Sequence, residues 1–353
     1  MIAPGIYFGL PSEDYHADPA LGGTDVNLLA RDPVEFQFRR LQPEKEETAA
    51  LVRGQAQHAR CLEGRTAFER GFKTIPDRAD YPEPILDTIE ELREHAVGLG
   101  LDKLPRLKAD LISMIRLVDQ EVVIWQEIMW QHEADPRTPI PKTTALAIEQ
   151  SAQWMQADPL IGAVMEDGTF QGGQPEVSVF WEEAGLRLKA RFDYLLPHAI
   201  VDLKTFSPWR DQTIEAGAIN AIVSYRYDLQ AAHYMRGWQA ASQHWRKRAR
   251  FEVRGDKINP LAAEALCKLA FAHDVPLWIW VFTKTIGAPQ PIVLEWSHER
   301  ALFSFSSAET EVTNALIRYL DLVKEFGADK PWPPRHKAVL IEDSMWPPWF
   351  GRR

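Results

Sequence analysis

The sequence has very little cysteine and no long hydrophobic run. Cys61 and Cys267 are the only cysteines, and neither belongs to a CxxC pair or to a Cys/His spacing typical of zinc sites. We therefore expect no disulfide framework and no structural zinc. No stretch of about 18 apolar residues occurs, and the N-terminus has no basic segment followed by an apolar run. We expect neither a membrane span nor a secretory signal, and a reducing cytoplasm as the location.

The chain also lacks an excess of positive charge. Lys and Arg number 40 against 50 Asp and Glu, which gives a net charge of −10. A chain of this charge can bind nucleic acid only through a local basic surface, because its overall field repels phosphate. The remaining composition, with 45% hydrophobic and 25% charged residues, is ordinary for a globular protein and excludes disordered and fibrous chains.

Hydrophobic periodicity divides the chain into four segments. Residues 1–83 are expected to form the helical entry to the main domain, and 84–120 a helix-turn-helix unit inserted into it. Residues 121–329 hold the core of the domain, and 330–353 form an irregular arm rich in Pro and Trp. No internal repeat occurs in the sequence.

Period-two alternation and apolar runs mark strands between these helices. The expected strands are 5–9, 177–181, 187–193, 200–205 and 277–283. One helix is expected to begin at residue 24. The other expected helices span 51–62, 108–117, 143–155, 227–244 and 309–326. This pattern predicts a mixed α/β fold (α+β), in which a central mixed sheet is flanked by helices.

Two neighbouring strands are expected to bring acidic and basic side chains together. Because strand side chains alternate between faces, Asp193 lies on the charged face of strand 187–193, and Asp202 and Lys204 lie on the outward face of 200–205. The two strands read as a hairpin, so two carboxylates converge beside an ammonium. Carboxylates are preferred ligands of Mg²⁺, and phosphodiester hydrolysis uses such an ion with a lysine that orients the nucleophile.

Taken alone, Asp-x-Lys fits a solvated and mutually paired strand surface better, because so short a pattern recurs by chance. Further polar residues raise its specificity. Gln230 and Tyr234 are four apart on one helical face and could hold a phosphate. His58 shares a predicted helical face with Leu51, Gln55 and Leu62 and could complete a metal sphere, although lone histidines are more often structural. Glu176 is a further carboxylate, which could equally be solvated.

These residues occur in motifs with a fixed order along the chain. The motifs hold His58 in Gly-Gln-Ala-Gln-His-Ala-Arg-Cys-Leu-Glu, Glu176 in Pro-Glu-Val-Ser-Val-Phe-Trp, Asp193 in Arg-Phe-Asp, Asp202 and Lys204 in Asp-Leu-Lys, and Gln230 with Tyr234. In this order they resemble exonuclease VIII of the RecE type. The opening Gly-Ile-Tyr and the pair Arg226 and Tyr227 resemble the same family. Phe192 precedes Asp193 at the position where the pattern of the PD-(D/E)XK superfamily, to which that family belongs, has a proline.

The resemblance implies a PD-(D/E)XK nuclease, related to phage lambda exonuclease and to the RecB nuclease domain, with a restriction-endonuclease-like core. Such an enzyme digests linear double-stranded DNA with Mg²⁺, for which Mn²⁺ substitutes. Family members work from a 5′ end and leave a 3′ single strand for an annealing protein, and several assemble as rings. The resemblance thereby implies double-stranded DNA ends and a single-strand annealing protein as partners, possible homo-oligomerisation, and a bacterial cell with a phage or prophage origin.

The resemblance also assigns roles to single residues. Asp193, Asp202, His58 and the Leu203 backbone carbonyl would bind the metal. Lys204 would serve the attacking water. Glu176 would support the metal site. The side chains expected at the DNA are Gln230, Tyr234, Arg191, Arg226, Lys103, Lys108, Arg246, Lys247 and Arg248.

Two basic segments have alternative interpretations. The inserted unit 84–120 resembles a SAP-type helix-extension-helix motif that binds phosphate through Lys103, Arg106 and Lys108, but a helical hairpin that caps the core is equally compatible. The basic run 244–257 could be a DNA track or a solvated helix end.

Two other functions stay open: a site-specific or structure-specific endonuclease on the same core, and an idle DNA-binding protein. The presence of His58, Asp193, Asp202 and Lys204 argues against an idle protein, because loss of function usually removes at least one such residue. No unambiguous base-reading element supports the endonuclease.

Overall fold

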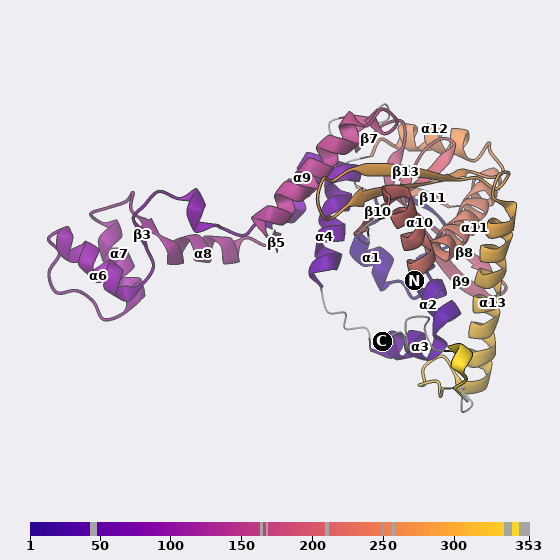
Figure 1. Ribbon diagram of the computed structural model, residues 1–353, viewed down its shortest axis with the longest axis horizontal. Coiled ribbons are helices and arrows are strands. Elements are labelled where there is room, and N and C mark those ends of the chain that lie inside the picture. Colours follow the sequence, from indigo (N-terminus) through magenta and orange to yellow (C-terminus); the bar gives the residue numbers. More distant parts are fainter. Residues whose placement is uncertain are drawn as a thin grey trace.

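One mixed sheet is the centre of the computed structural model, which describes residues 1–42, 48–162, 165–166, 169–208, 212–248, 250–255, 258–334 and 341–345. In the described part of the chain this sheet has seven strands in the order β11-β1-β8-β9-β10-β12-β13 (Figure 1). The strands are β1 (Gly5–Phe8), β8 (Gln174–Glu183), β9 (Leu186–Leu195), β10 (Ala199–Phe206), β11 (Phe251–Val253), β12 (Leu277–Lys284) and β13 (Pro291–Trp296). All five predicted strands are present.

The pairing along the sheet is mixed, as predicted. β8, β9 and β10 pair in antiparallel fashion, so the predicted hairpin around residues 197–198 is confirmed. β10 and β12 are parallel, and parallel neighbours need a long crossover. The crossover here contains α10 (Ile214–Tyr225), α11 (Tyr227–Arg246) and α12 (Pro260–Ala270).

Helices cover both faces of the sheet. The larger hydrophobic cluster joins the sheet to α2 (Gly23–Arg31), α11 and α13 (Leu302–Phe326), and includes Phe192 and Trp238. A smaller cluster on the other face joins Val201 and Leu203 to α9 (Lys142–Ala157) and to the segment after α4 (Ala49–His58). Val201 and Leu203 thus face inward, as the alternation predicts.

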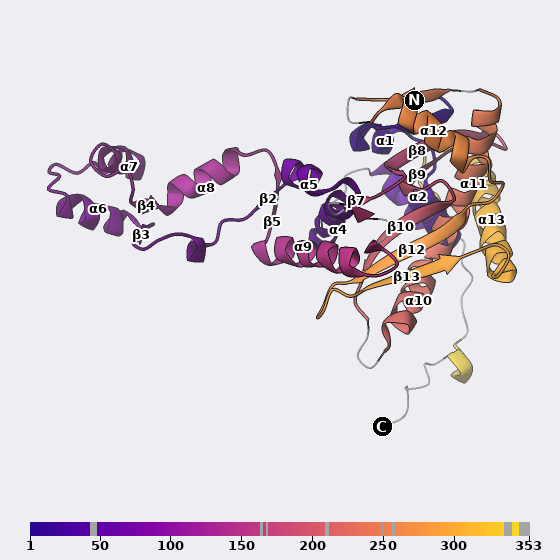
Figure 2. The same cartoon turned by 90° about the horizontal axis from the view of Figure 1, so that it is seen from above.

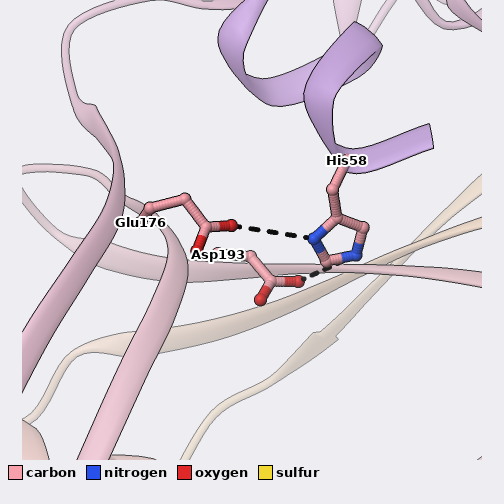
Figure 3. A group of neighbouring side chains, drawn as sticks. All are labelled: His58, Glu176 and Asp193. Carbon is pink, nitrogen blue, oxygen red and sulfur yellow. Dashed lines mark ion pairs between the residues drawn. The ribbon is translucent and has the colours of Figure 1, made fainter. Parts of the chain in front are cut away.

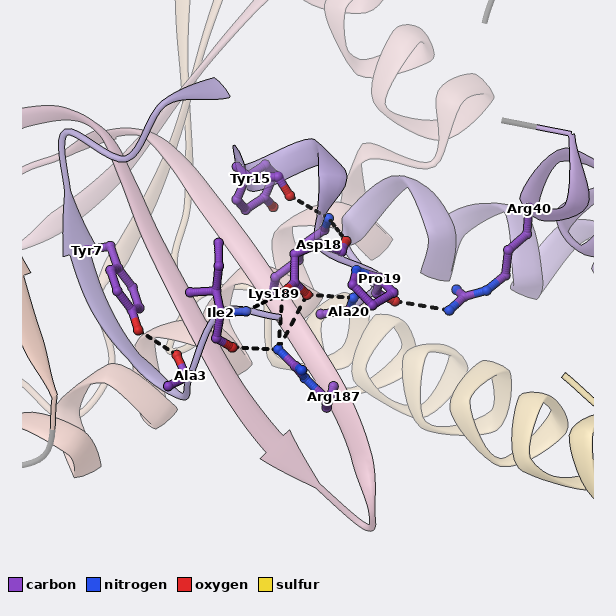
Figure 4. A network of polar contacts seen from close by, with 10 residues as sticks. All are labelled: Ile2, Ala3, Tyr7, Tyr15, Asp18, Pro19, Ala20, Arg40, Arg187 and Lys189. Carbon is purple, nitrogen blue, oxygen red and sulfur yellow. Dashed lines mark hydrogen bonds and ion pairs between the residues drawn. The ribbon is translucent and has the colours of Figure 1, made fainter. Parts of the chain in front are cut away.

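The charged face of β9 is buried, whereas the alternation suggested an open charged surface. Lys189 and Asp193 are 6% and 8% exposed. The N-terminal segment that follows β1, with α1 (Ser12–Ala17), covers this face (Figure 4). Lys189 Nζ donates hydrogen bonds to the carbonyls of Tyr15 (2.7 Å) and Asp18 (2.6 Å). The buried charge is tolerated because backbone oxygens replace its water.

The helix that carries His58 departs from the predicted face. The α-helix ends at His58 and continues as a π-helical turn, Ala59–Glu63. A π turn holds an extra residue, so Leu62 is buried while Leu51 and Gln55 are exposed. The prediction that Leu62 shares one helical face with Leu51, Gln55 and His58 is therefore wrong.

The inserted unit projects from the main body (Figures 1 and 2). Its base is the parallel pair β2 (Phe72–Thr74) and β5 (Thr138–Ile140). Beyond this base lie β3 (Ile85–Leu86), α6 (Ile89–Gly98), α7 (Lys108–Arg116), β4 (Val123–Ile124) and α8 (Trp125–Ala134). The two expected helices of the 84–120 unit are present, within the segment 75–137 that lies between β2 and β5. It has its own hydrophobic cluster and does not cap the core.

The remaining described helices and short strands surround these elements. They are α3 (Pro33–Leu41), α5 (Arg65–Gly71), β6 (Met165–Glu166), β7 (Thr169–Phe170) and the 3₁₀ turns Arg78–Asp80 and Asp343–Met345.

The start of the C-terminal arm packs on the body. Trp332 is 3% exposed and contacts the rings of Phe36 and Tyr319. The second Trp-Pro cluster, at 346–349, lies outside the described residues. Among the described helices, none combines the length and the apolar character needed to cross a bilayer.

The buried Lys189 generates a stability prediction. Lys189→Met removes the donor for two buried carbonyls, and an unpaired buried polar group costs about 1–3 kcal/mol. We expect a loss of roughly 2–4 kcal/mol of unfolding free energy in urea titrations. Lys268→Met, on the exposed face of α12, is the control and should change little. Equal stability of both variants would contradict the proposed anchoring role of Lys189.

Candidate active site

Three side chains from distant parts of the chain meet at one end of the sheet (Figure 3). His58 comes from the end of α4, Glu176 from β8 and Asp193 from β9. His58 Nδ1 lies 3.8 Å from Glu176 Oε1, and His58 Nε2 lies 3.6 Å from Asp193 Oδ2. One ligand atom from each residue falls within 4.8 Å of the others, so this trio can hold a metal ion.

The local backbone explains why these side chains converge. Pairing between β9 and β10 stops at Tyr194 and Val201. Beyond this pair, the Asp193 carboxylate replaces the backbone acceptor of the neighbouring strand. Its Oδ2 accepts a hydrogen bond from the Leu203 N–H at 2.9 Å. Glu176 has φ 54, in the left-handed region that non-glycine residues rarely adopt. Such strain clusters at functional sites.

Leu203 contributes both of its backbone groups to the site. While its N–H binds Asp193, its carbonyl oxygen lies 3.1 Å from His58 Nε2. The structure thus brings the carbonyl of Leu203, His58 and Asp193 together, as the sequence predicted. Imidazole nitrogen, carboxylate oxygen and carbonyl oxygen are all ligand types that divalent cations accept.

Asp202 stands beside this trio and pairs with Lys204. It is 1% exposed, and its Oδ1 accepts a hydrogen bond from Lys204 Nζ at 2.8 Å. Among the described residues its Oδ2 has no hydrogen-bond partner. A buried carboxylate oxygen without a partner is costly, so this atom fits a ligand position for a cation. The trio of possible ligands nevertheless forms without Asp202.

Burial and charge set the protonation of this pair. Burial and the nearby Asp193 together raise the pKa of Asp202 to about 6, against the opposing effect of Lys204. Burial alone would lower the pKa of Lys204, but the carboxylates of Asp202 and Asp193 raise it. Lys204 is therefore a firmly protonated cation at neutral pH.

His58 is also shifted toward its charged form. Burial would lower the pKa of His58, but Asp193 and Glu176 outweigh it and raise the pKa to about 9. At neutral pH the imidazolium therefore occupies the place of a cation between two carboxylates. A metal ion bound here must displace that proton.

The two residues predicted on one face of α11 lie against the same site. Gln230 Nε2 lies 3.5 Å from Asp202 Oδ1, and Tyr234 is 8% exposed beneath it. Burial raises the pKa of Tyr234. Gly23 of α2 allows this approach, because a Cβ there would lie 3.0 Å from the Tyr234 ring and 3.1 Å from Gln230 Cγ.

Arg191 is buried, contrary to the expected DNA contact. Its guanidinium donates to Ser178 Oγ at 2.9 Å and to the Leu10 carbonyl at 2.8 Å, and lies over the Tyr15 ring. Its Nη1 is 3.5 Å from Glu176 Oε2. The N-terminal segment therefore holds Arg191 against Glu176, and the arginine supports the site from within the protein.

The other arginines and lysines expected at the DNA lie apart from the trio. Arg226 pairs with Asp228 and Glu311, and Arg246 with Asp274. Lys247 and Arg248 are exposed after α11. These contacts leave the DNA roles of Arg226, Arg246, Lys247 and Arg248 as predictions.

Lys108 is the first residue of α7 and Lys103 precedes it in the turn after α6, and these two helices lie at the far end of the projecting segment (Figures 1 and 2). Residues 75–137 hold 7 Lys and Arg against 14 Asp and Glu. This balance opposes a general phosphate grip, since nonspecific DNA affinity comes from basic side chains. The excess of acidic residues in this segment therefore weakens the SAP-like interpretation.

Tyr227 is a neighbour of the site to which the sequence assigned no role. Lys204 Nζ lies 5.1 Å from the centroid of its ring. The sequence could have indicated this neighbour, because Tyr227 precedes Gln230 by three residues and so lies on the same face of the helix.

The raised pKa of His58 generates a prediction for metal uptake. Because the metal displaces a proton from a group with a pKa of about 9, affinity for Mn²⁺ should rise about tenfold from pH 7 to pH 8. Asp202, with a pKa of about 6, is already ionised in this range. Calorimetry checks this: His58→Gln should bind weakly and without the slope, whereas exposed His273→Gln should behave like wild type. A wild-type affinity independent of pH would remove His58 from the ligand set.

Comparison with known proteins assigns the chain to a family. The family described as "PDDEXK-like domain of unknown function (DUF3799)" matches residues 39–251. No curated protein matches the chain. The crystal structure of a candidate exonuclease from Eubacterium rectale is similar with a TM-score of 0.47 and 12% identity, over 96% of this chain and 98% of that one. Because the family match spans more than half of the 353 residues and contains the whole trio, the chain belongs to this family and has its PDDEXK-like nuclease fold.

Proposed function

We propose that this protein is a metal-dependent deoxyribonuclease that digests linear double-stranded DNA from its ends. The observation that carries the proposal is the convergence of His58, Glu176 and Asp193 next to the buried Asp202 and Lys204 pair. Carboxylates, an imidazole and a fixed ammonium in one place are the groups that phosphodiester hydrolysis needs. A solvated surface pair, the simpler alternative for Asp-x-Lys, does not fit a carboxylate that is 1% exposed.

The residues present fit a divalent cation, for which Mg²⁺ is our proposal and Mn²⁺ a substitute. His58, Asp193 and the Leu203 carbonyl would hold it, and the unpartnered Oδ2 of Asp202 offers a further ligand. Glu176 would bind the ion directly or orient His58. When bound, such an ion activates water and neutralises charge on the phosphate.

The protein's own residues supply the remaining work. Lys204, fixed by Asp202 and by the Tyr227 ring, can orient the attacking water or stabilise the charge that develops on phosphate oxygen. Gln230 lies beside Asp202 and can donate to a phosphate oxygen of the bound strand. Arg191 keeps Glu176 aimed at His58.

Attack on ends, in the 5′ to 3′ direction, is proposed from the resemblance of the ordered motifs to exonucleases of the RecE type. The same resemblance supports a recombination role, in which the 3′ single strand passes to an annealing protein. A homo-oligomeric ring and a phage or prophage origin in a bacterial cytoplasm are proposed on this ground alone.

The choice of DNA substrate tests the proposal. Linear, nicked and covalently closed duplexes are incubated with Mg²⁺ or with EDTA. We expect loss of linear DNA with Mg²⁺ only, and early release of the 5′ label from end-labelled duplex. Cutting of closed circles would identify an endonuclease instead, and binding without cutting would identify an idle DNA-binding protein.

Single variants should separate metal uptake from chemistry. Asp193→Asn should lose both Mn²⁺ binding in calorimetry and cleavage. Lys204→Met should keep metal binding but lose at least about a hundredfold in cleavage rate, because it removes charge stabilisation from the reaction. Lys268→Met is the matched control and should cleave normally. Near-normal turnover by Lys204→Met would exclude the catalytic role of this lysine.

A further inference from the structure

An exposed tyrosine lies one ring away from the catalytic lysine. Tyr225 is the last residue of α10, and its side chain is 64% exposed. Its ring stacks on that of Tyr227, with centroids 5.6 Å apart and an interplanar angle of 29°. Tyr227 in turn faces Lys204 Nζ, which lies 5.1 Å from its ring centroid. The two rings therefore form a stack that runs from the half-buried Lys204 to solvent.

The backbone holds this stack in place. Arg226, between the two tyrosines, has φ 53, so the chain makes a left-handed turn from α10 into α11. Asn27 Nδ2 of α2 donates to the carbonyls of Tyr225 (2.8 Å) and Arg226 (3.3 Å). Ion pairs from Arg226 to Asp228 and Glu311 brace the same turn. The exposed ring is thus presented on a fixed support rather than on a loose loop.

A single exposed aromatic ring needs no explanation by itself, since apolar side chains are common on protein surfaces. The position of Tyr225 is what distinguishes it. A ring that is stacked on one side, exposed, and next to a lysine assigned to a phosphate group offers a platform for a flat ligand. Bases of unpaired strands stack on such rings regardless of sequence, because every base has a π-face.

We infer that Tyr225 stacks against a nucleobase of the DNA strand whose phosphate reaches Lys204. The inference rests on the proposed nuclease function and extends it to a contact with an unpaired base. It assigns to the exposed end of the tyrosine stack the task of holding one nucleotide at the site, without sequence preference. Two further apolar side chains of α10, Ile219 and Val223, are 51% and 64% exposed and extend the apolar surface of this helix.

Photocrosslinking tests this contact directly. Duplexes with 5-iodouracil in the nucleotides nearest the 5′ end are bound in Ca²⁺, after a check that the DNA stays intact, and irradiated. We expect the wild-type protein to crosslink at Tyr225, as mapped by mass spectrometry. Tyr225→Phe should keep the crosslink and the affinity. Tyr225→Ala should lose the crosslink and bind the duplex about tenfold more weakly.

Phe303→Ala is the matched control, because Phe303 is an 89% exposed ring on α13. It should bind and crosslink like wild type. Unchanged affinity and crosslinking in Tyr225→Ala, with cleavage of linear DNA by the wild-type protein, would overturn the stacking role and leave the nuclease proposal intact. A wild-type protein that neither binds nor cleaves DNA would instead remove the nuclease function, and the stacking role with it.

Discussion

The active site depends on one hydrogen bond in which a side chain takes the place of a backbone acceptor. Where β9 and β10 separate, the Asp193 carboxylate accepts the N–H of Leu203, and the Leu203 carbonyl is left facing His58. An unbroken ladder would use both backbone groups and bring no carboxylate to this point. The separation therefore creates the site while keeping the buried N–H satisfied. It also turns an ordinary hairpin into a place where an imidazole, a carbonyl and a carboxylate meet.

The charges of the site are kept in place by burial. Asp202 and Lys204 form a pair that is nearly closed to solvent, and a buried pair is costly unless its geometry is good. One oxygen of Asp202 stays without a partner, which is a cost that a bound cation would offset. The same logic applies to Arg191, whose burial is compensated by Ser178 and by backbone carbonyls of the N-terminal segment. That segment thereby supports the site through the contact of Arg191 with Glu176.

Charge is distributed unevenly over the molecule. The projecting segment 75–137 holds twice as many acidic as basic residues and has its own small core. At its base, Arg137 donates a hydrogen bond to the backbone carbonyl of Glu69, and Lys73 of β2 donates one to the backbone carbonyl of Asp135, so both ends of the segment are tied to the body. The segment itself extends away from the sheet (Figure 2).

The sequence by itself determined the strands, the long helices and the candidate polar residues, because alternation and helical spacing are local properties. His58, Asp193 and the carbonyl of Leu203 were predicted from ordered motifs, and the fold brings them together. Only the tertiary structure decided that the charged face of β9 is buried, since covering it takes a segment about 170 residues away in the chain. The same holds for the hydrogen bond from Asn27 to the Tyr225 carbonyl and for the contact of Lys204 with the Tyr227 ring, which join elements that are not neighbours in the chain. Periodicity reports which side of an element is apolar, but it carries no information on what will cover the other side.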